Sequence, residues 1–234
     1  MDLKGNSVTW IGHGTWLWET SEGRRIMIDP WLKGNPVAPP ELQNPWPLDA
    51  VLITHGHFDH VGDAVEAIRQ TGATVVANFE TGHWLEKNGC QNVIQMNKGG
   101  TVEVGGCKVT MVNAIHSGAI LDGDQLISGG DPAGFVIEFP NGLVVYQAGD
   151  TDVFGDMALI AEIYRPDVAV LPIGGHFTMG PRQAAHAIRL LGVRQVVCGH
   201  FSTFPVLSGT PEAVRALVPA TVEVPDMSPG TRLS

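Results

Sequence analysis

The chain has 234 residues, 44% of them hydrophobic and 16% charged, which is enough apolar material for one large core. Its net charge of −10, with no long run among its 14 Lys and Arg residues, argues against general binding to nucleic acid. The sequence lacks a stretch of roughly 18 apolar residues and the apolar core of a signal peptide, so we expect one cytoplasmic domain over residues 1–234 without membrane association.

The first part of the chain combines antiparallel strands with strand–helix alternation. Aromatic and β-branched residues flank Gly and polar breaks near the N-terminus, whereas a helical spacing that ends at Gly72 follows a short apolar run. A Pro-rich stretch, residues 34–47, is expected to form a surface loop. The predicted elements are antiparallel strands within 7–20, a strand at 25–29, a buried strand at 50–54, a helix at 62–72, a strand at 74–79 and a short helix at 81–89.

The second part of the chain starts with two hairpins and returns to alternation. Gly105 and Gly106 separate one pair of strands, and residues 140–142 (Pro-Asn-Gly) separate the other. The predicted elements are strands at 101–106, 107–115, 134–139 and 143–148, a helix at 156–164, a strand at 167–173, a helix at 181–192, a strand at 195–199 and a helix at 210–218. Hairpins fit an all-parallel wound sheet poorly, so the pattern favours an α/β fold of two stacked mixed sheets with helices outside.

The cysteines indicate a reducing compartment. Cys90, Cys107 and Cys198 are an odd number, widely spaced and without a CxxC pair. We expect them to be small buried apolar residues.

Histidines and aspartates cluster just after predicted strands. The carboxyl ends of strands are where α/β folds gather ligands, because that crevice is open to solvent yet held by a rigid scaffold. Four predicted strands are followed in this way by His55, His57, Asp59 and His60, by His116, by Asp150, and by His200.

The segment HGHFDH, residues 55–60, indicates a metal site. Three histidines and an aspartate within six residues are hard to explain as solvated turn chemistry, although a lone histidine after a strand is most often an ordinary surface residue. Neutral imidazoles and carboxylates suit Zn²⁺ and related ions, and seven such groups are about what two ions need. Gly56 is expected to permit a tight backbone path between the first two histidines.

HGHFDH resembles the H-x-H-x-D-H signature of the metallo-β-lactamase superfamily. Further blocks resemble, in the same order, those of the UPF0173 metal-dependent hydrolase family, which is similar to a lactonase-like branch of that superfamily. These blocks are IDPWLKGNP, THGHFDHVGDAVE, TGATVVAN, NAIHS, PAGFVIE, AGDT, LPIGGHFTMGP and HFSTFP. The resemblance implies the αβ/βα four-layer sandwich, with two mixed sheets flanked by helices.

The resemblance also implies a ligand set for two divalent ions, with Zn expected and Mn or Fe as alternatives. In that assignment Asp150 bridges the ions, and Asp29 braces a ligand from behind, the alternative for Asp29 being a plain turn residue ahead of Pro30. The first ion is assigned to His55, His57 and His116, and the second to Asp59, His60 and His200.

Two more histidines lie near predicted strand ends, His13 and His176. His13 is expected to line the site, and His176 to touch substrate or bound water, the alternative for each being a structural loop histidine. A proton must reach the leaving group, and Asp59, His176 or a metal-bound water are the candidates, which makes Asp59 and His176 the proposed catalytic residues.

The expected activity is hydrolysis by water that two metal ions activate. The sequence shows no GxSxG block and no convincing nucleophilic Ser or Cys near a base, so direct attack by water is preferred. The expected substrate is a small-molecule lactone, ester or amide. The alternatives are a phosphodiesterase on a small nucleotide-like substrate, an iron-dependent redox enzyme, and a metal-binding protein without catalysis.

Overall fold

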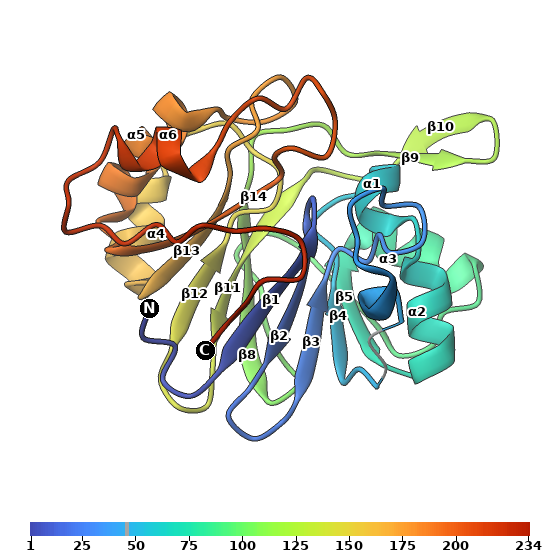
Figure 1. Cartoon of the computed structure of the whole chain (residues 1–234). Coiled ribbons are helices and arrows are strands. Elements are labelled where there is room, and N and C mark those ends of the chain that lie inside the picture. The colour runs from blue at the N-terminus through green and yellow to red at the C-terminus, as the bar shows by residue number, and fades with distance from the viewer. Residues whose placement is uncertain (45–46) are drawn as a thin grey trace.

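Two β-sheets face each other, and helices cover the outer side of each. The computed structural model describes residues 1–44 and 47–234, so positions 45 and 46 of the predicted Pro-rich loop lie outside the described residues. Figure 1 shows helices α1–α3 on the outside of one sheet and α4–α6 on the outside of the other. This is the αβ/βα sandwich that the resemblance implied, and the expected α/β class with two mixed sheets is confirmed.

The first sheet is antiparallel on one side and parallel on the other. Its first four strands pair antiparallel, and from β3 onward the neighbours run parallel. Across the described part of this sheet the order is β15 (Arg232–Leu233), β1 (Ser7–Gly12), β2 (Thr15–Glu19), β3 (Arg25–Ile28), β4 (Ala50–Leu52), β5 (Thr74–Asn78) and β6 (Val93–Met96).

The second sheet repeats this plan. Its first three strands are parallel, the third of them pairs with the fourth in the hairpin predicted at residues 140–142, and the last two strands form the hairpin predicted at Gly105–Gly106. Across the described part of this sheet the order is β14 (Gln195–Gly199), β13 (Val168–Pro172), β12 (Val144–Gln147), β11 (Ala133–Glu138), β8 (Cys107–Asn113) and β7 (Thr101–Val104).

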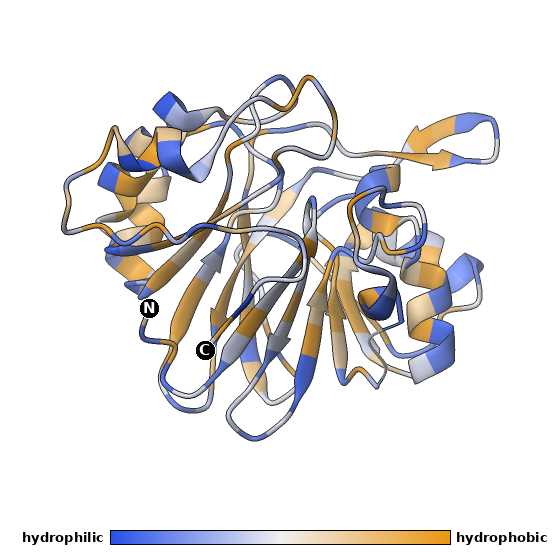
Figure 2. Cartoon of the chain, in the orientation of Figure 1, coloured by the Kyte–Doolittle hydropathy of each residue, from blue (hydrophilic) through white to orange (hydrophobic). Residues whose placement is uncertain are grey.

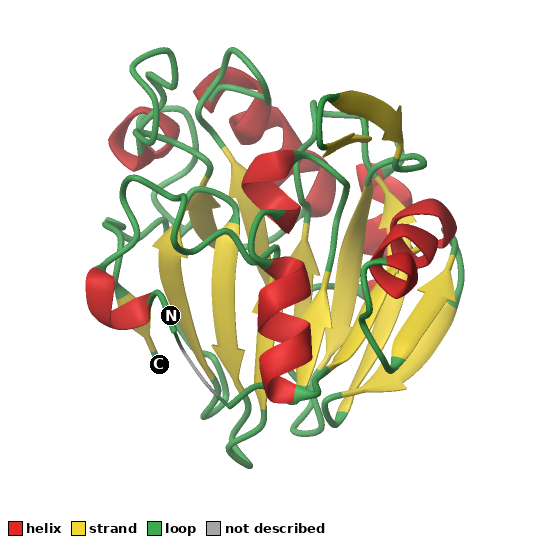
Figure 3. Cartoon of the chain, turned by 90° about the vertical axis from the view of Figure 1, so that its right-hand side faces the viewer, coloured by secondary structure: helices red, strands yellow, loops and turns green. Residues whose placement is uncertain are grey.

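The helices begin and end at residues with the expected chemistry. Gly72 and Gly192 adopt the left-handed conformation at the C-termini of α2 and α5, and Pro181 stands in the first turn of α5. Figure 3 shows helices packed in front of the strands. The helices are α1 (Phe58–Val61), α2 (Ala64–Thr71), α3 (Phe79–Lys87), α4 (Met157–Tyr164), α5 (Pro181–Leu191) and α6 (Pro211–Arg215), with a 3₁₀ turn at Pro40–Leu42.

Several predicted boundaries differ from the structure by one to three residues, and two helix ends show a physical reason. The last helix ends at Arg215 rather than reaching residue 218, because Val218 precedes Pro219 and that position disfavours the helical conformation. Helix α3 begins two residues early, because the side chain of Asn78 accepts a hydrogen bond from the Thr81 N–H and so caps the helix.

Three strand features were not predicted. They are β6, the short β15, and a separate hairpin of β9 (Ala119–Asp122) and β10 (Gln125–Ser128) that projects from the body in Figure 1. Ile120 of this hairpin is buried against Gly56, where an added Cβ would clash with the Ile120 side chain. Gly56 therefore makes room for the hairpin.

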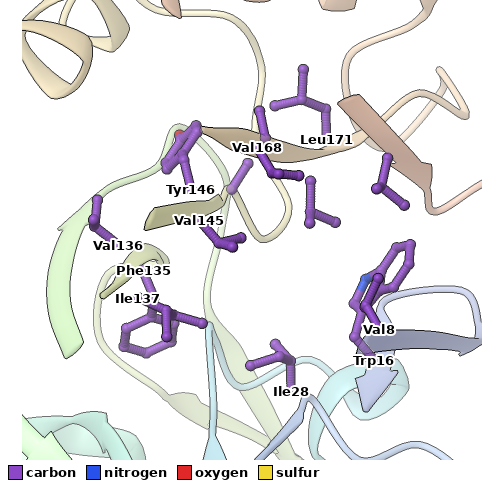
Figure 4. Close-up of a cluster of buried hydrophobic side chains, with 14 of the residues drawn as sticks. Val8, Trp16, Ile28, Phe135, Val136, Ile137, Val145, Tyr146, Val168 and Leu171 are labelled. Carbon is purple, nitrogen blue, oxygen red and sulfur yellow. The ribbon is translucent and has the colours of Figure 1, made fainter. Parts of the chain in front are cut away.

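The largest apolar cluster lies between the two sheets. Figure 2 shows hydrophobic residues along the strands, and Figure 4 shows Val8, Trp16 and Ile28 of the first sheet near Phe135 and Val145 of the second. The three free cysteines are buried, as expected. Within the part of the chain that the structure describes, no helix has the length and apolarity needed to cross a membrane.

Candidate metal centre

The predicted ligands meet at one end of the two sheets, where β4, β8, β12 and β14 finish. His55, His116 and Asp150 each stand three residues beyond a strand, and His200 follows β14 directly. Both sheets contribute, so the centre lies across the line where they face each other. The structure brings together all seven side chains that the resemblance assigned as ligands, and their metal binding stays a prediction.

His55, His57 and His116 form the first group, with one ring nitrogen of each within 4.8 Å of the others. Thr54 donates its hydroxyl hydrogen to Asp29, so Nδ1–H of His55 donates to the Thr54 oxygen at 2.9 Å. This leaves the lone pair of His55 Nε2 inside the group, where His57 Nδ1 lies 2.9 Å away.

Asp59, His60, His200 and His13 form the second group by the same measure. Asp150 lies between the two groups: its Oδ2 is 2.9 Å from His200 Nε2, 3.3 Å from His60 Nε2 and 3.7 Å from His116 Nε2. A carboxylate in this position is placed to serve both groups.

Asp29 holds His60 from behind, as the resemblance implied. Its carboxylate accepts hydrogen bonds from the Thr54 N–H at 2.7 Å and the Thr54 hydroxyl at 2.6 Å, and it lies 2.8 Å from His60 Nδ1. A proton fixed on Nδ1 directs Nε2 of His60 toward Asp150. Asp29 is buried, so these bonds are not in competition with water.

His13 holds Asp59 in the same way. Burial lowers the pKa of His13 to about 4 despite the neighbouring carboxylate, so the ring is neutral at pH 7. Its Nε2–H donates to Asp59 Oδ2 at 2.8 Å, and its Nδ1 accepts from the Thr203 hydroxyl at 2.9 Å. Both nitrogens are used, which places His13 as a positioning residue rather than a ligand.

The protonation states favour cation binding. Burial lowers the pKa of His55 well below its usual value, and lowers those of His57 and His116 as well. Burial opposes ionisation of Asp150, but the charges of His200 and His60 outweigh it and hold its pKa well below the usual range. The first group thus offers three neutral imidazoles beside an ionised carboxylate, which is the form in which these groups bind metals.

Asp59 is also ionised, and His60 carries a proton without metal. Burial alone would raise the pKa of Asp59, but the hydrogen bond from His13 and the charge of His60 lower it to about 2. Burial opposes protonation of His60, yet Asp150 and Asp29 raise its pKa well above the usual value. A metal ion bound to Nε2 of His60 would replace the proton on the side of Asp150, and the proton on Nδ1 would stay against Asp29.

Buried nitrogen atoms without partners fit a resident metal. Among the described residues, His60 Nε2 and both ring nitrogens of His200 are buried without a hydrogen-bond partner, although both Nε2 atoms lie near Asp150. Unpartnered buried polar atoms are unfavourable unless a ligand satisfies them. The donor set of imidazoles and carboxylates suits Zn²⁺, Mn²⁺ and iron.

Several site residues adopt a left-handed backbone that side chains rarely take. The φ angles are 54° at His13, 48° at Asp29 and 53° at His200. The strained turns are tied together: the His13 carbonyl accepts from the His200 N–H at 3.0 Å and from the Trp10 indole at 2.9 Å. The rest of the fold therefore holds these residues in place against their local preference.

A cavity of about 670 Å³ opens onto the centre. Its polar part is formed by Ser117, whose hydroxyl lies 3.2 Å from His57 Nε2, and by five of the proposed ligands: His57, Asp59, His116, Asp150 and His200. Its apolar part is formed by Phe58, Phe177, Phe204, Pro205 and Val206.

The structure places His176 outside both ligand groups. Its side chain is exposed, and its ring stands edge-on to Phe177, which lines the cavity in its place. Its catalytic role stays a prediction. His83 and His186 lie exposed on α3 and α5.

The cavity wall was not predicted from the sequence, nor were Thr54 and Thr203, two polar residues that orient His55 and His13. The available signal for the wall was an aromatic residue in the loop after a predicted strand, with Phe177 four residues past the strand at 167–173 and Phe204 five residues past the strand at 195–199. Phe201, which follows His200 directly, stacks on Trp10 with ring centroids 4.7 Å apart.

Known proteins share both the sequence and this fold. The model of the beta-lactamase superfamily domain matches residues 24–201. UPF0173 metal-dependent hydrolases of Rubrobacter xylanophilus and Koribacter versatilis are 54% and 49% identical to the chain, over 90% and 98% of it and 87% and 98% of the relatives. The metallo hydrolase Igni18 from Ignicoccus hospitalis is 37% identical with a TM-score of 0.84, and the match covers 97% of both chains. The chain belongs to the UPF0173 family of metal-dependent hydrolases, within the beta-lactamase superfamily.

Proposed function

We propose that the protein hydrolyses a small-molecule lactone, ester or amide at a site that binds two divalent metal ions. The observation that supports this most is the position of Asp150, whose carboxylate lies within 3.7 Å of histidines from both groups. One bridging carboxylate between two sets of ligands is typical of two-metal hydrolytic sites.

Each ion would have its own ligands besides Asp150, and zinc fits this nitrogen-rich set. When bound, the two ions supply hydroxide at neutral pH and polarise the oxygen of the bond under attack. The assignment is His55, His57 and His116 for one ion, and Asp59, His60 and His200 for the other.

The chain itself contributes orientation and proton transfer. Asp59 lines the cavity and is ionised at neutral pH, so it accepts a proton before it delivers one to a leaving group. His13 fixes the direction of the Asp59 carboxylate, which confines that exchange to one oxygen. The Ser117 hydroxyl, also in the cavity wall, is available to bind a substrate oxygen.

The first test combines metal analysis with a substrate panel. We expect a colourless protein containing about two Zn or Mn ions per chain, with turnover of lactones, thioesters or β-lactams exceeding that of phosphodiesters. His57→Ala should reduce the rate to background. His83→Ala, which replaces an exposed histidine on α3, should leave the rate unchanged. Bound iron with visible absorbance, or a preference for phosphodiesters, would contradict the proposal.

A second test concerns His13. Replacing His13 with Ala removes the donor that directs Asp59, so we expect the affinity for one of the two ions to fall by about 10- to 100-fold while the other is retained. Metal titration with elemental analysis measures this. His13→Asn, which keeps a donor of shorter reach, should recover part of the affinity. If His13→Ala bound both ions with the wild-type affinities, His13 would have no positioning role.

A further inference from the structure

We propose that the site takes an uncharged substrate with an aromatic or branched aliphatic group beside the bond that is cleaved, and that Phe58, Phe177 and Phe204 bind this group. The inference rests on the hydrolase function proposed above and specifies its substrate class.

The apolar side chains of the cavity wall are unusually exposed to solvent. Phe58 is 54% exposed, Phe177 53% and Val206 47%. Exposed apolar side chains gathered around one hollow indicate a ligand surface, since scattered ones would be ordinary. The hollow is the one that contains the proposed metal ligands, so a group bound there lies next to the reacting bond.

The phenylalanines come from both halves of the fold and rest on a rigid base. Phe58 opens α1 beside Asp59, and Phe204 follows Thr203, the hydrogen-bond partner of His13. The buried ring of Trp31 packs edge-on to Phe58 with centroids 5.8 Å apart, and its centroid lies 6.1 Å from that of Phe204. Both walls are thus supported from below and ready to receive a flat apolar group.

The apolar part of the cavity offers no cationic side chain to an anionic tail. Of the described residues that line the cavity, none is Lys or Arg. A phosphate or carboxylate on the substrate would leave water for an apolar wall without a cationic partner, which is unfavourable. The chain's net charge of −10 opposes the approach of such substrates as well.

Three lactones with the same ring test the inference on the metal-loaded protein: γ-butyrolactone, its γ-phenyl derivative and its γ-carboxy derivative. We expect kcat/KM for the phenyl derivative to exceed that for the parent by at least about tenfold, and that for the carboxy derivative to be the lowest. Phe177→Ala should reduce the phenyl preference to about threefold or less, and Phe177→Lys should raise the rate with the carboxy derivative. Phe79→Ala changes a phenylalanine on α3 that is 57% exposed and outside the cavity, and it should preserve the wild-type order.

A binding measurement separates the two proposals. Calorimetric titration of the metal-loaded protein with phenylacetate and acetate, which share the carboxylate, should give a Kd at least about tenfold lower for phenylacetate, and Phe177→Ala should remove most of the difference. If no lactone is turned over but phenylacetate retains this advantage, lactone hydrolysis fails and the apolar subsite stands. If the lactones are turned over without a phenyl preference, or the carboxy derivative is the best substrate, the hydrolase function stands and the subsite is wrong.

Discussion

Asp150→Asn is expected to lower kcat/KM by about 1,000-fold or more, equivalent to about 4 kcal/mol of transition-state stabilisation. The carboxylate lies among His60, His116 and His200, and its pKa is held well below the usual range, so it supplies a full negative charge to both ligand groups. The amide has the same shape but no charge. We therefore also expect the metal content to fall below two ions per chain, measured by elemental analysis after dialysis.

Asp152→Asn is the matched control for that experiment. Asp152 lies two residues further on, is exposed, and accepts a hydrogen bond from the adjacent Val153 N–H. Its replacement should leave metal content unchanged and the rate within about twofold, as is usual for surface substitutions. An Asp150→Asn protein with two bound ions and the wild-type rate would remove Asp150 from the mechanism.

Asp29→Asn is expected to affect both stability and metal affinity. The buried carboxylate accepts two hydrogen bonds from Thr54 and contacts His60 Nδ1, and the amide would present a donor to a donor. We expect the metal-free protein to lose about 3 kcal/mol, or roughly 6 to 12 °C in Tm, measured by thermal unfolding. Metal affinity should fall by about 10- to 100-fold, because His60 loses its fixed orientation.

Asp63→Asn separates these two effects. The carboxylate of Asp63 accepts hydrogen bonds from the backbone N–H groups of Leu32 and Lys33, whereas that of Asp29 contacts a histidine ring. We expect a modest loss of stability and unchanged metal affinity. If Asp29→Asn behaved in the same way, Asp29 would have only a structural role.

The positions of the proposed ligands were predictable because local sequence fixes them. An apolar run ends, a polar residue follows within three positions, and the carboxyl ends of β4, β8, β12 and β14 bring these residues to the same end of the sheets. The hairpins and most helices were predictable for the same reason, since Gly72, Pro181 and Gly105–Gly106 act within one or two turns of chain.

The cavity wall was not predictable, because the exposure of a side chain depends on segments distant in sequence. Phe58, Phe177 and Phe204 differ from core phenylalanines such as Phe135 only in what packs around them. The β9–β10 hairpin was missed because Leu121 and Leu126 are exposed, so burial does not impose the strand alternation on which sequence patterns depend.

At His13, Asp29 and His200 the left-handed backbone favours glycine, whereas the proposed centre requires a side chain. Glycine adopts such a conformation without the roughly 1 kcal/mol or more that other residues incur. A laboratory evolution experiment that rewards thermal resistance alone should therefore favour glycine at His200, whose two ring nitrogens are buried without a hydrogen-bond partner, more than at Asp29, whose hydrogen bonds to Thr54 and contact with His60 offset the backbone cost. A glycine at His200 would erase a group that serves the proposed centre. Robustness and catalytic competence thus trade off residue by residue at this end of the sheets, and libraries for improving the enzyme should leave these three codons unmutated.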